Sequence, residues 1–120
     1  MTDHPRFSAQ TLSVLAALEA DPSEWRHGYL LAKQTGLASG TLYPILIRLS
    51  DRHVIEARWE DEQPAGRPRR HLYRLTAAGL AAARGALARE ALAEEAAARR
   101  RQAAAGRAAR QRLATEGRAC

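Results

Sequence analysis

Two short segments with alternating side chains lie in the middle of a chain in which most other segments have helical patterns. The first, VIEARWEDE (residues 54–62), places Ile55, Ala57 and Trp59 on one face, and RHLYRLT (residues 70–76) alternates in the same way. A period of two residues is typical of a β-strand with two unlike faces, and no helix satisfies it. The two segments are therefore predicted to form a β-hairpin, with Trp59 packed in the core.

The connection between the two segments combines turn residues with positive charge. It contains Pro64, Gly66 and Pro68 together with Arg67, Arg69 and Arg70. Six arginines and no acidic residue occur from residue 63 to residue 89. This pattern predicts a stiff loop tip that contacts something negative, such as DNA phosphates or a minor groove. A solvated loop without a partner is the alternative interpretation.

Three helical patterns precede the predicted hairpin. The first covers about residues 8–20 with Ser8 as N-cap, and the second covers residues 27–35 and stops at Gly36. The third starts near residues 39–41, because Pro44 is tolerated only in a first helical turn. The apolar face of this third helix, at i, i+3, i+4 and i+7, consists of Leu42, Ile45, Leu46 and Leu49.

A long final helix is predicted to follow the hairpin, with Thr76 as its N-cap. Residues 77–101 are rich in Ala, Arg, Glu and Leu, which are strong helix formers, and they carry a thin apolar stripe. Residues 102–120 form a basic Ala/Arg-rich tail, for which a fraying helix and disorder are both left open. The expected fold class is mainly α with a small β-hairpin. It comprises a winged helix-turn-helix in residues 1–76, a dimerisation helix in residues 77–101 and the tail.

The distribution of charge and of reactive side chains excludes several classes of function. Residues 99–120 contain seven arginines and one glutamate, so this segment accounts for the whole net charge of +6. The high pI therefore does not by itself indicate that the domain binds nucleic acid. The four histidines and the single cysteine, Cys120, lack the spacing of a metal site, so no metal and no cofactor are expected. No catalytic arrangement is present either, and an enzyme is not expected.

The location of the protein is predicted from its apolar segments. The first ten residues contain no apolar segment typical of a signal peptide, and no apolar run approaches the length of a membrane span. The expected location is the cytoplasm, with association to the nucleoid when the protein is bound to DNA.

Two helices joined by a tight turn and followed by a basic hairpin are typical of a winged helix-turn-helix. In such a module the third helix enters the major groove and the hairpin, or wing, contacts the backbone or the minor groove. Ser39 and Thr41 could instead be caps only, and Ile47 could contact a thymine methyl or be an ordinary surface residue. Within the third helix, Thr41, Tyr43 and Arg48 are expected to lie nearest the bases. The candidate DNA-binding residues are Ser39, Thr41, Tyr43, Pro44, Ile47, Arg48, Arg67, Arg69 and Arg70.

Three motifs, GYLLAKQTG, GTLYPILIRL and GRPRRHLYRLTAAG, occur in this order between residues 28 and 79. Together they resemble the PadR family of bacterial transcriptional regulators, in its compact branch with a single C-terminal helix. The resemblance implies a winged helix-turn-helix, a dimerising C-terminal helix and repression of a target operon. It also implies a small hydrophobic or aromatic effector. The last helix has no aromatic residue, which argues against the flat-drug binding seen in some relatives.

The predicted function is that of a sequence-specific regulator, a ligand-responsive repressor that binds a palindromic operator as a homodimer. Its expected partners are double-stranded DNA, a second copy of the chain and the effector, with no membrane. The expected dimer contacts are Leu12, Leu15, Leu80, Ala83, Leu87 and Ala91. Two alternatives remain open. One is a winged-helix module that binds proteins, and the other is a nucleic-acid-binding protein without sequence preference that relies on its basic tail.

Overall fold

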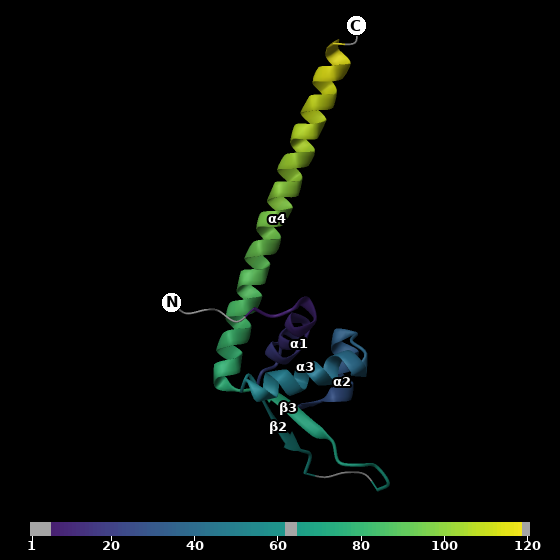
Figure 1. Cartoon of the computed structure of the whole chain (residues 1–120), viewed down its shortest axis with the longest axis vertical. Helices are drawn as coiled ribbons and strands as arrows, with labels where there is room; N and C mark the ends of the chain where they lie inside the picture. Colours follow the sequence, from purple (N-terminus) through teal and green to yellow (C-terminus); the bar gives the residue numbers. More distant parts are fainter. Residues whose placement is uncertain (1–5, 62–64, 119–120) are drawn as a thin grey trace. The chain divides into compact units, whose positions relative to one another are not determined.

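The computed structural model describes residues 6–61 and 65–118, so Pro64 and Cys120 lie outside the described residues. The chain divides into two compact units, Met1–Leu87 and Ala88–Cys120. The boundary between the units falls within the last helix, because the first turns of that helix pack against the core of the first unit. The elements, in chain order, are α1 (Ala9–Glu19), β1 (Arg26–His27), α2 (Gly28–Thr35), α3 (Ser39–Asp51), β2 (Ile55–Trp59), β3 (His71–Leu75) and α4 (Ala77–Arg118) (Figure 1).

Local capping sets the ends of the first two helices. The Ser8 hydroxyl accepts a hydrogen bond from the Thr11 N–H at 3.1 Å, which confirms Ser8 as the N-cap of α1. Helix α2 ends at Gly36, whose φ of 73° is left-handed and whose N–H donates to the Ala32 carbonyl at 2.8 Å. Glycine adopts this conformation without strain, so the chain turns sharply between α2 and α3.

One hydrophobic core holds the three short helices and the sheet together. Helix α3 contributes the four residues that its period predicted, Leu42, Ile45, Leu46 and Leu49, each at most 2% exposed. The rest of the buried core consists of Val14, Leu15, Leu18, Leu31, Val54, Ile55, Tyr73, Leu75 and Ala83.

Burial in this core corrects two of the predicted dimer contacts. Leu15 and Ala83 are fully covered by the chain's own atoms, and they offer no side-chain surface to a second copy. Apolar periodicity identifies which face of a helix is buried, but it does not say whether the same chain or a partner covers that face. Leu12 and Leu80 are partly buried against the same core, whereas Leu87 is half-buried and Ala91 is exposed.

The predicted hairpin is present, and a short third strand extends it. The strand order is β1-β3-β2, and all pairs are antiparallel. Trp59 pairs with His71 at the wing end of the sheet, and Arg26 pairs with Tyr73 on the other edge. Strand β1 is only two residues long, so no alternation in the sequence could have indicated it.

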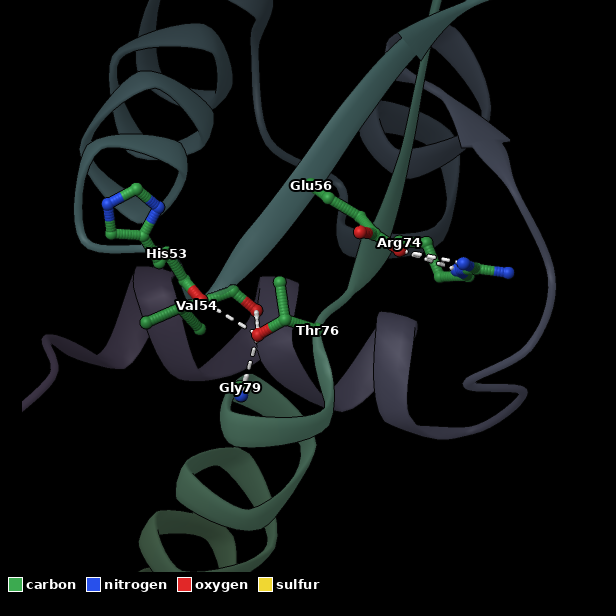
Figure 2. Close-up of polar contacts among 6 residues, drawn as sticks. All are labelled: His53, Val54, Glu56, Arg74, Thr76 and Gly79. Carbon is green, nitrogen blue, oxygen red and sulfur yellow. Dashed lines mark hydrogen bonds and ion pairs between the residues drawn. The ribbon is translucent and has the colours of Figure 1, made fainter.

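Thr76 connects the end of the sheet, the end of α3 and the start of α4. Figure 2 shows its hydroxyl donating to the carbonyls of His53 at 2.7 Å and Val54 at 3.2 Å, while it accepts from the Gly79 N–H at 2.8 Å. The prediction that Thr76 caps the last helix is therefore confirmed. A side chain at Gly79 would collide with the Val54 carbonyl, so only glycine fits here.

Helix α4 continues beyond its expected end at Arg101 and reaches Arg118. The residues after Arg101 are mostly Ala, Arg and Gln, which favour helix, and no proline interrupts them. The segment after Arg101 is thus helical as far as Arg118, which is one of the two alternatives left open above. None of the helices within the described residues is long and apolar enough to cross a membrane.

Candidate nucleic-acid interface

The outward face of α3 carries the side chains expected to meet DNA. Ile47 is 61% exposed and Tyr43 is 43% exposed, and Pro44 lies between them on the surface. The N-cap of α3 is Ala38, which makes no side-chain capping hydrogen bond. The hydroxyls of Ser39 and Thr41 therefore do not serve as the cap of this helix, although they lie in its exposed first turn.

A groove of about 600 Å³ lies beside this face, between the helices and the wing. Gly28, Tyr29 and Tyr43 line its helical side. The wing side is lined by Trp59, Arg69, Arg70, His71 and Tyr73. Aromatic rings and guanidinium groups thus face each other, and no carboxylate is among these lining residues. This chemistry suits an anionic partner with apolar surface between its charges, such as a sugar–phosphate backbone.

Trp59 lies on the wall of this groove and not in the core, which makes its predicted position wrong. It is 53% exposed and stacks on His71 with ring centroids 3.9 Å apart. Trp59 is the last residue of β2, where the hairpin extends past the helices that cover the sheet, so alternation alone overestimated its burial. A smaller hollow of about 230 Å³, lined in part by Ile47, Asp51 and His71, adjoins the same side of α3.

The other face of the sheet carries a different aromatic cluster. Trp25 lies under the guanidinium groups of Arg58 and Arg74, at 4.4 Å and 4.3 Å from the ring centre. Arg74 also pairs with Glu56 at 2.7 Å, as Figure 2 shows. Side chains alternate along a strand, so Arg58 and its neighbour Trp59 point to opposite faces of the sheet. This cluster is therefore separate from the groove.

The three wing arginines differ in their surroundings. The Arg67 guanidinium pairs with the Glu60 carboxylate at 2.7 Å, and the Arg70 N–H donates to the same oxygen at 3.1 Å. The hydrogen bond from Arg67 lowers the pKa of Glu60. Within residues 6–61 and 65–118, Arg69 and Arg70 form no ion pair. Acidic and basic residues that are separate along the sequence thus meet across the hairpin, which the linear charge pattern did not reveal.

The ring of Tyr43 is held at the start of α2. A side chain at Gly28 would collide with the Tyr43 phenol, so the ring occupies space that only glycine leaves open. Tyr73 lines the same groove as Tyr43, and burial, followed by the charge of Tyr43, raises the pKa of the Tyr73 phenol. Tyr43 therefore links the outward face of α3 to both walls of the groove.

His27 caps α2 beside the groove. Its Nδ1 accepts a hydrogen bond from the Leu30 N–H at 3.2 Å, which requires an unprotonated nitrogen. Burial, followed by the charge of Arg70, lowers the pKa of His27, with Glu60 opposing and Arg67 adding to the effect. The surroundings thus favour the neutral, capping form of the ring.

The structure brings some of the predicted DNA-binding residues together, since Tyr43, Arg69 and Arg70 line one groove and Ile47 borders the adjoining hollow. Ser39, Thr41 and Pro44 lie on α3, and Arg67 lies on the wing loop. Arg48 is exposed but lies on the flank of α3 that faces α1. The predicted DNA-binding residues did not include five of the residues that line the groove, Gly28, Tyr29, Trp59, His71 and Tyr73. The only available signal was the hairpin register, which sets Trp59 opposite His71.

Comparisons with known proteins place this geometry among bacterial regulators. The family described as the transcriptional regulator PadR-like family matches residues 14–85. No curated protein matches the sequence significantly.

Among solved structures, the PcaV transcriptional regulator of Streptomyces coelicolor is similar, with 25% identity, a TM-score of 0.64 and coverage of 74% of this chain and 61% of that chain. A PadR family regulator of Clostridium difficile R20291 has 24% identity and a TM-score of 0.63, covering 74% of this chain and 94% of its own. A PadR-like regulator of Bacillus cereus has 20% identity and a TM-score of 0.62, covering 77% and 90%. The chain thus spans about three fifths of the length of PcaV, and the shared region has the winged-helix fold.

Proposed function

The chain belongs to the PadR-like family of transcriptional regulators, and on this basis we propose that it is a ligand-responsive repressor that binds a palindromic operator as a homodimer. The observation that carries the proposal is the placement of the groove. Tyr43 of α3 and two wing arginines without ion pairs among the described residues border a single concave surface. Such a groove can receive part of one sugar–phosphate strand while α3 enters the major groove and the wing contacts the backbone.

The residues of this surface divide into two roles. Thr41, Tyr43 and Ile47 project from α3 and lie nearest the base edges and thymine methyl groups. Arg69 and Arg70 neutralise phosphates, which adds affinity without sequence preference. Arg67 acts mainly through Glu60, because this ion pair fixes the wing loop and leaves Arg69 and Arg70 directed at DNA.

Dimerisation would come from the apolar side chains of α4 that the first unit leaves uncovered. Leu87 is half-buried, and Leu92 is 63% exposed. These two leucines give α4 apolar surface that a second copy could bury, and burial of apolar surface favours association. Two copies of α3 related by a two-fold axis would then read half-sites about 34–36 Å apart, or a multiple of that spacing.

The proposed effector is a small hydrophobic or aromatic molecule. Its support is indirect, since PcaV has been crystallised with its natural ligand. The chain's own contribution is the set of aromatic side chains beside α3. An effector that binds the DNA-free form more tightly than the DNA-bound form would release the operator.

The test begins with in vitro selection of duplexes from a random library. The expected result is an enriched inverted repeat, which is called the selected duplex below. Arg69→Ala should weaken binding to the selected duplex and to random duplexes by the same factor and reduce the salt dependence. Ile47→Ala should instead reduce the preference for the selected duplex. Selection without any enriched sequence would contradict specific recognition.

The same assay separates the two alternatives. If the tail alone drives binding, deletion of residues 99–120 should abolish binding to all duplexes, whereas the proposed repressor should keep its preference for the selected duplex. If the protein is a protein-binding module, neither Arg69→Ala nor Ile47→Ala should affect any duplex, because none would bind measurably.

A further inference from the structure

A second basic hollow lies on the flank of α3 that faces away from the wing. It has a volume of about 190 Å³. Three arginines border it, Arg6 from the segment before α1 and Arg48 and Arg52 from α3 and its C-cap. The apolar side chains of Phe7, Ile45 and Leu49 form part of its lining. Neither the matched family description nor the groove described above accounts for this cluster.

The helical period separates this hollow from the wing groove. At about 100° per residue, Arg48 and Arg52 lie on one flank of α3, while Tyr43 and Ile47 lie on the other. The lining residues agree, since Tyr43 and Ile47 border the two wing-side hollows and neither arginine does. Basic side chains thus flank the exposed face of α3 on both sides.

The charge of this hollow is not compensated locally. Within the described ranges, residues 6–61 and 65–118, none of the three arginines forms an ion pair, and no carboxylate lines the hollow. Asp51 is the last residue of the same helix but borders the wing-side hollow. Like charges held close together cost free energy, and a bound anion removes that cost.

The position of Arg6 is supported by its neighbours along the chain. Phe7 packs against the hydrophobic core, and Ser8 caps α1 and also donates its hydroxyl to that of Thr11 at 2.9 Å. This anchoring keeps Arg6 beside α3, although it lies near the beginning of the chain. The hollow is therefore formed jointly by α3 and the segment that precedes α1, and not by a run of charges on one helix.

We propose that Arg6, Arg48 and Arg52 bind backbone phosphates of DNA on the side of α3 opposite the wing. The proposal deepens the proposed function and rests on it. A major groove about 12 Å wide just admits a helix about 10–12 Å in diameter, so a strand of backbone passes along each side. The wing would contact one strand, and the arginine hollow would contact the other. Arg48, which the sequence placed nearest the bases, would then contact a phosphate.

The experiment measures affinity for the selected and random duplexes at several salt concentrations. Arg6→Ala and Arg52→Ala should each weaken binding to both kinds of duplex equally. Each should also reduce the slope of log K against log salt by about 0.9 for every phosphate that the variant no longer neutralises. Arg52→Lys keeps the charge and should keep most of the slope. Arg58→Ala is the matched control, because it removes the same charge from the Trp25 cluster on the outer face of the sheet.

The outcomes distinguish this proposal from the proposed function. The hollow is not a phosphate site if Arg6→Ala and Arg52→Ala behave like Arg58→Ala, or if they weaken binding to the selected duplex alone. If the wild type binds random duplexes without preference but the slope still depends on Arg6 and Arg52, the phosphate site stands and the specific repressor does not. If the wild type binds no duplex, both proposals fail.

A further competition experiment tests whether the hollow binds backbone phosphate or a free anion. Inorganic phosphate and chloride are compared as competitors of DNA at equal ionic strength. A backbone contact predicts that inorganic phosphate, which can occupy the same hollow, displaces DNA from the wild type more strongly than chloride does, and that Arg52→Ala removes this difference. If Arg52→Ala removes the binding of inorganic phosphate to the DNA-free protein but leaves the salt slope for DNA unchanged, the hollow is a site for a free anion and the proposal is overturned.

Discussion

At the scale of single residues, the shape of the groove depends on Gly28, which has no side chain with which to contact DNA. Gly28 leaves the space that the Tyr43 phenol occupies. In the proposed complex the Tyr43 hydroxyl donates a hydrogen bond to a DNA phosphate. Gly28→Ala should displace this ring and weaken DNA binding by about 1 kcal/mol, the net contribution of that hydrogen bond. The stability of the fold should hardly change, because the phenol is the exposed end of a side chain that can move.

A double-mutant cycle tests this explanation. Tyr43→Phe should weaken binding to a similar extent, and the double variant should bind no more weakly than either single variant, since both remove the same hydrogen bond. Additive effects would show that Gly28 acts on DNA binding by a route independent of Tyr43.

His27 makes the stability of α2 depend on pH. Its folded-state pKa lies below the ordinary value of 6.5, because burial and then Arg70 disfavour the charged ring. The unfolded chain therefore binds a proton more readily, and stability rises with pH in this window. The stabilisation is fully present above pH 6.5 and is lost as the pH falls through the folded-state pKa.

The expected measurement is the thermal midpoint across this pH range. His27→Asn keeps a side-chain cap but does not titrate, so the wild type should lose stability relative to this variant below pH 6.5. Parallel pH profiles for the two proteins would show that the imidazole cap has no part in the acid sensitivity.

At the scale of elements, two glycines of α4 are expected to respond in opposite ways to the same substitution. Gly79→Ala should destabilise the fold by about 1–3 kcal/mol, because its methyl group would collide with the Val54 carbonyl. Gly106→Ala should increase helix stability by about 0.8–1 kcal/mol, since only the Arg110 guanidinium lies near the new methyl group, at 3.7 Å. Urea and thermal unfolding followed by circular dichroism would measure both. If Gly79→Ala stabilised the fold, the expected collision between its methyl group and the Val54 carbonyl would be contradicted.

The elements also show how far the sequence determines this fold. Helices α1, α2 and α3 and the hairpin could be predicted because their signals are local, as with the Ser8 cap and the Gly36 stop. Strand β1 could not, since two residues carry no period and only the neighbouring β3 gives them a partner. The groove likewise depends on tertiary position. The exposure of Trp59 depends on how far the helices cover the sheet. The Arg67–Glu60 ion pair depends on the hairpin register, which brings the two residues together.

At the scale of the whole molecule, α4 should hold two copies of the chain together. Leu92→Glu should shift the protein towards the monomer, because a charge would replace an exposed apolar side chain in the proposed interface. Leu87→Glu should do the same, although Leu87 is also partly covered by its own chain. Binding to the selected duplex should be lost in parallel, which sedimentation and titration would measure together.

Leu113→Glu is the matched control for this prediction. Leu113 is 68% exposed on the same helix but lies outside the predicted dimerisation helix of residues 77–101. It should leave the dimer intact. If the Leu92 and Leu87 variants remain dimeric, the two copies meet through another surface.

The connection at Thr76 has a mechanical consequence for regulation. The Thr76 hydroxyl connects the carbonyls of His53 and Val54, between α3 and β2, to the first turn of α4. The end of α3 and the start of α4 are therefore expected to move together. In the proposed dimer, a displacement of the first turn of α4 would therefore be passed directly to the end of α3. Thr76→Val, which keeps the shape of the side chain but removes the hydroxyl, should loosen the connection between the end of α3 and the start of α4. The variant should still bind DNA and the proposed effector, but binding of one should no longer change the affinity for the other.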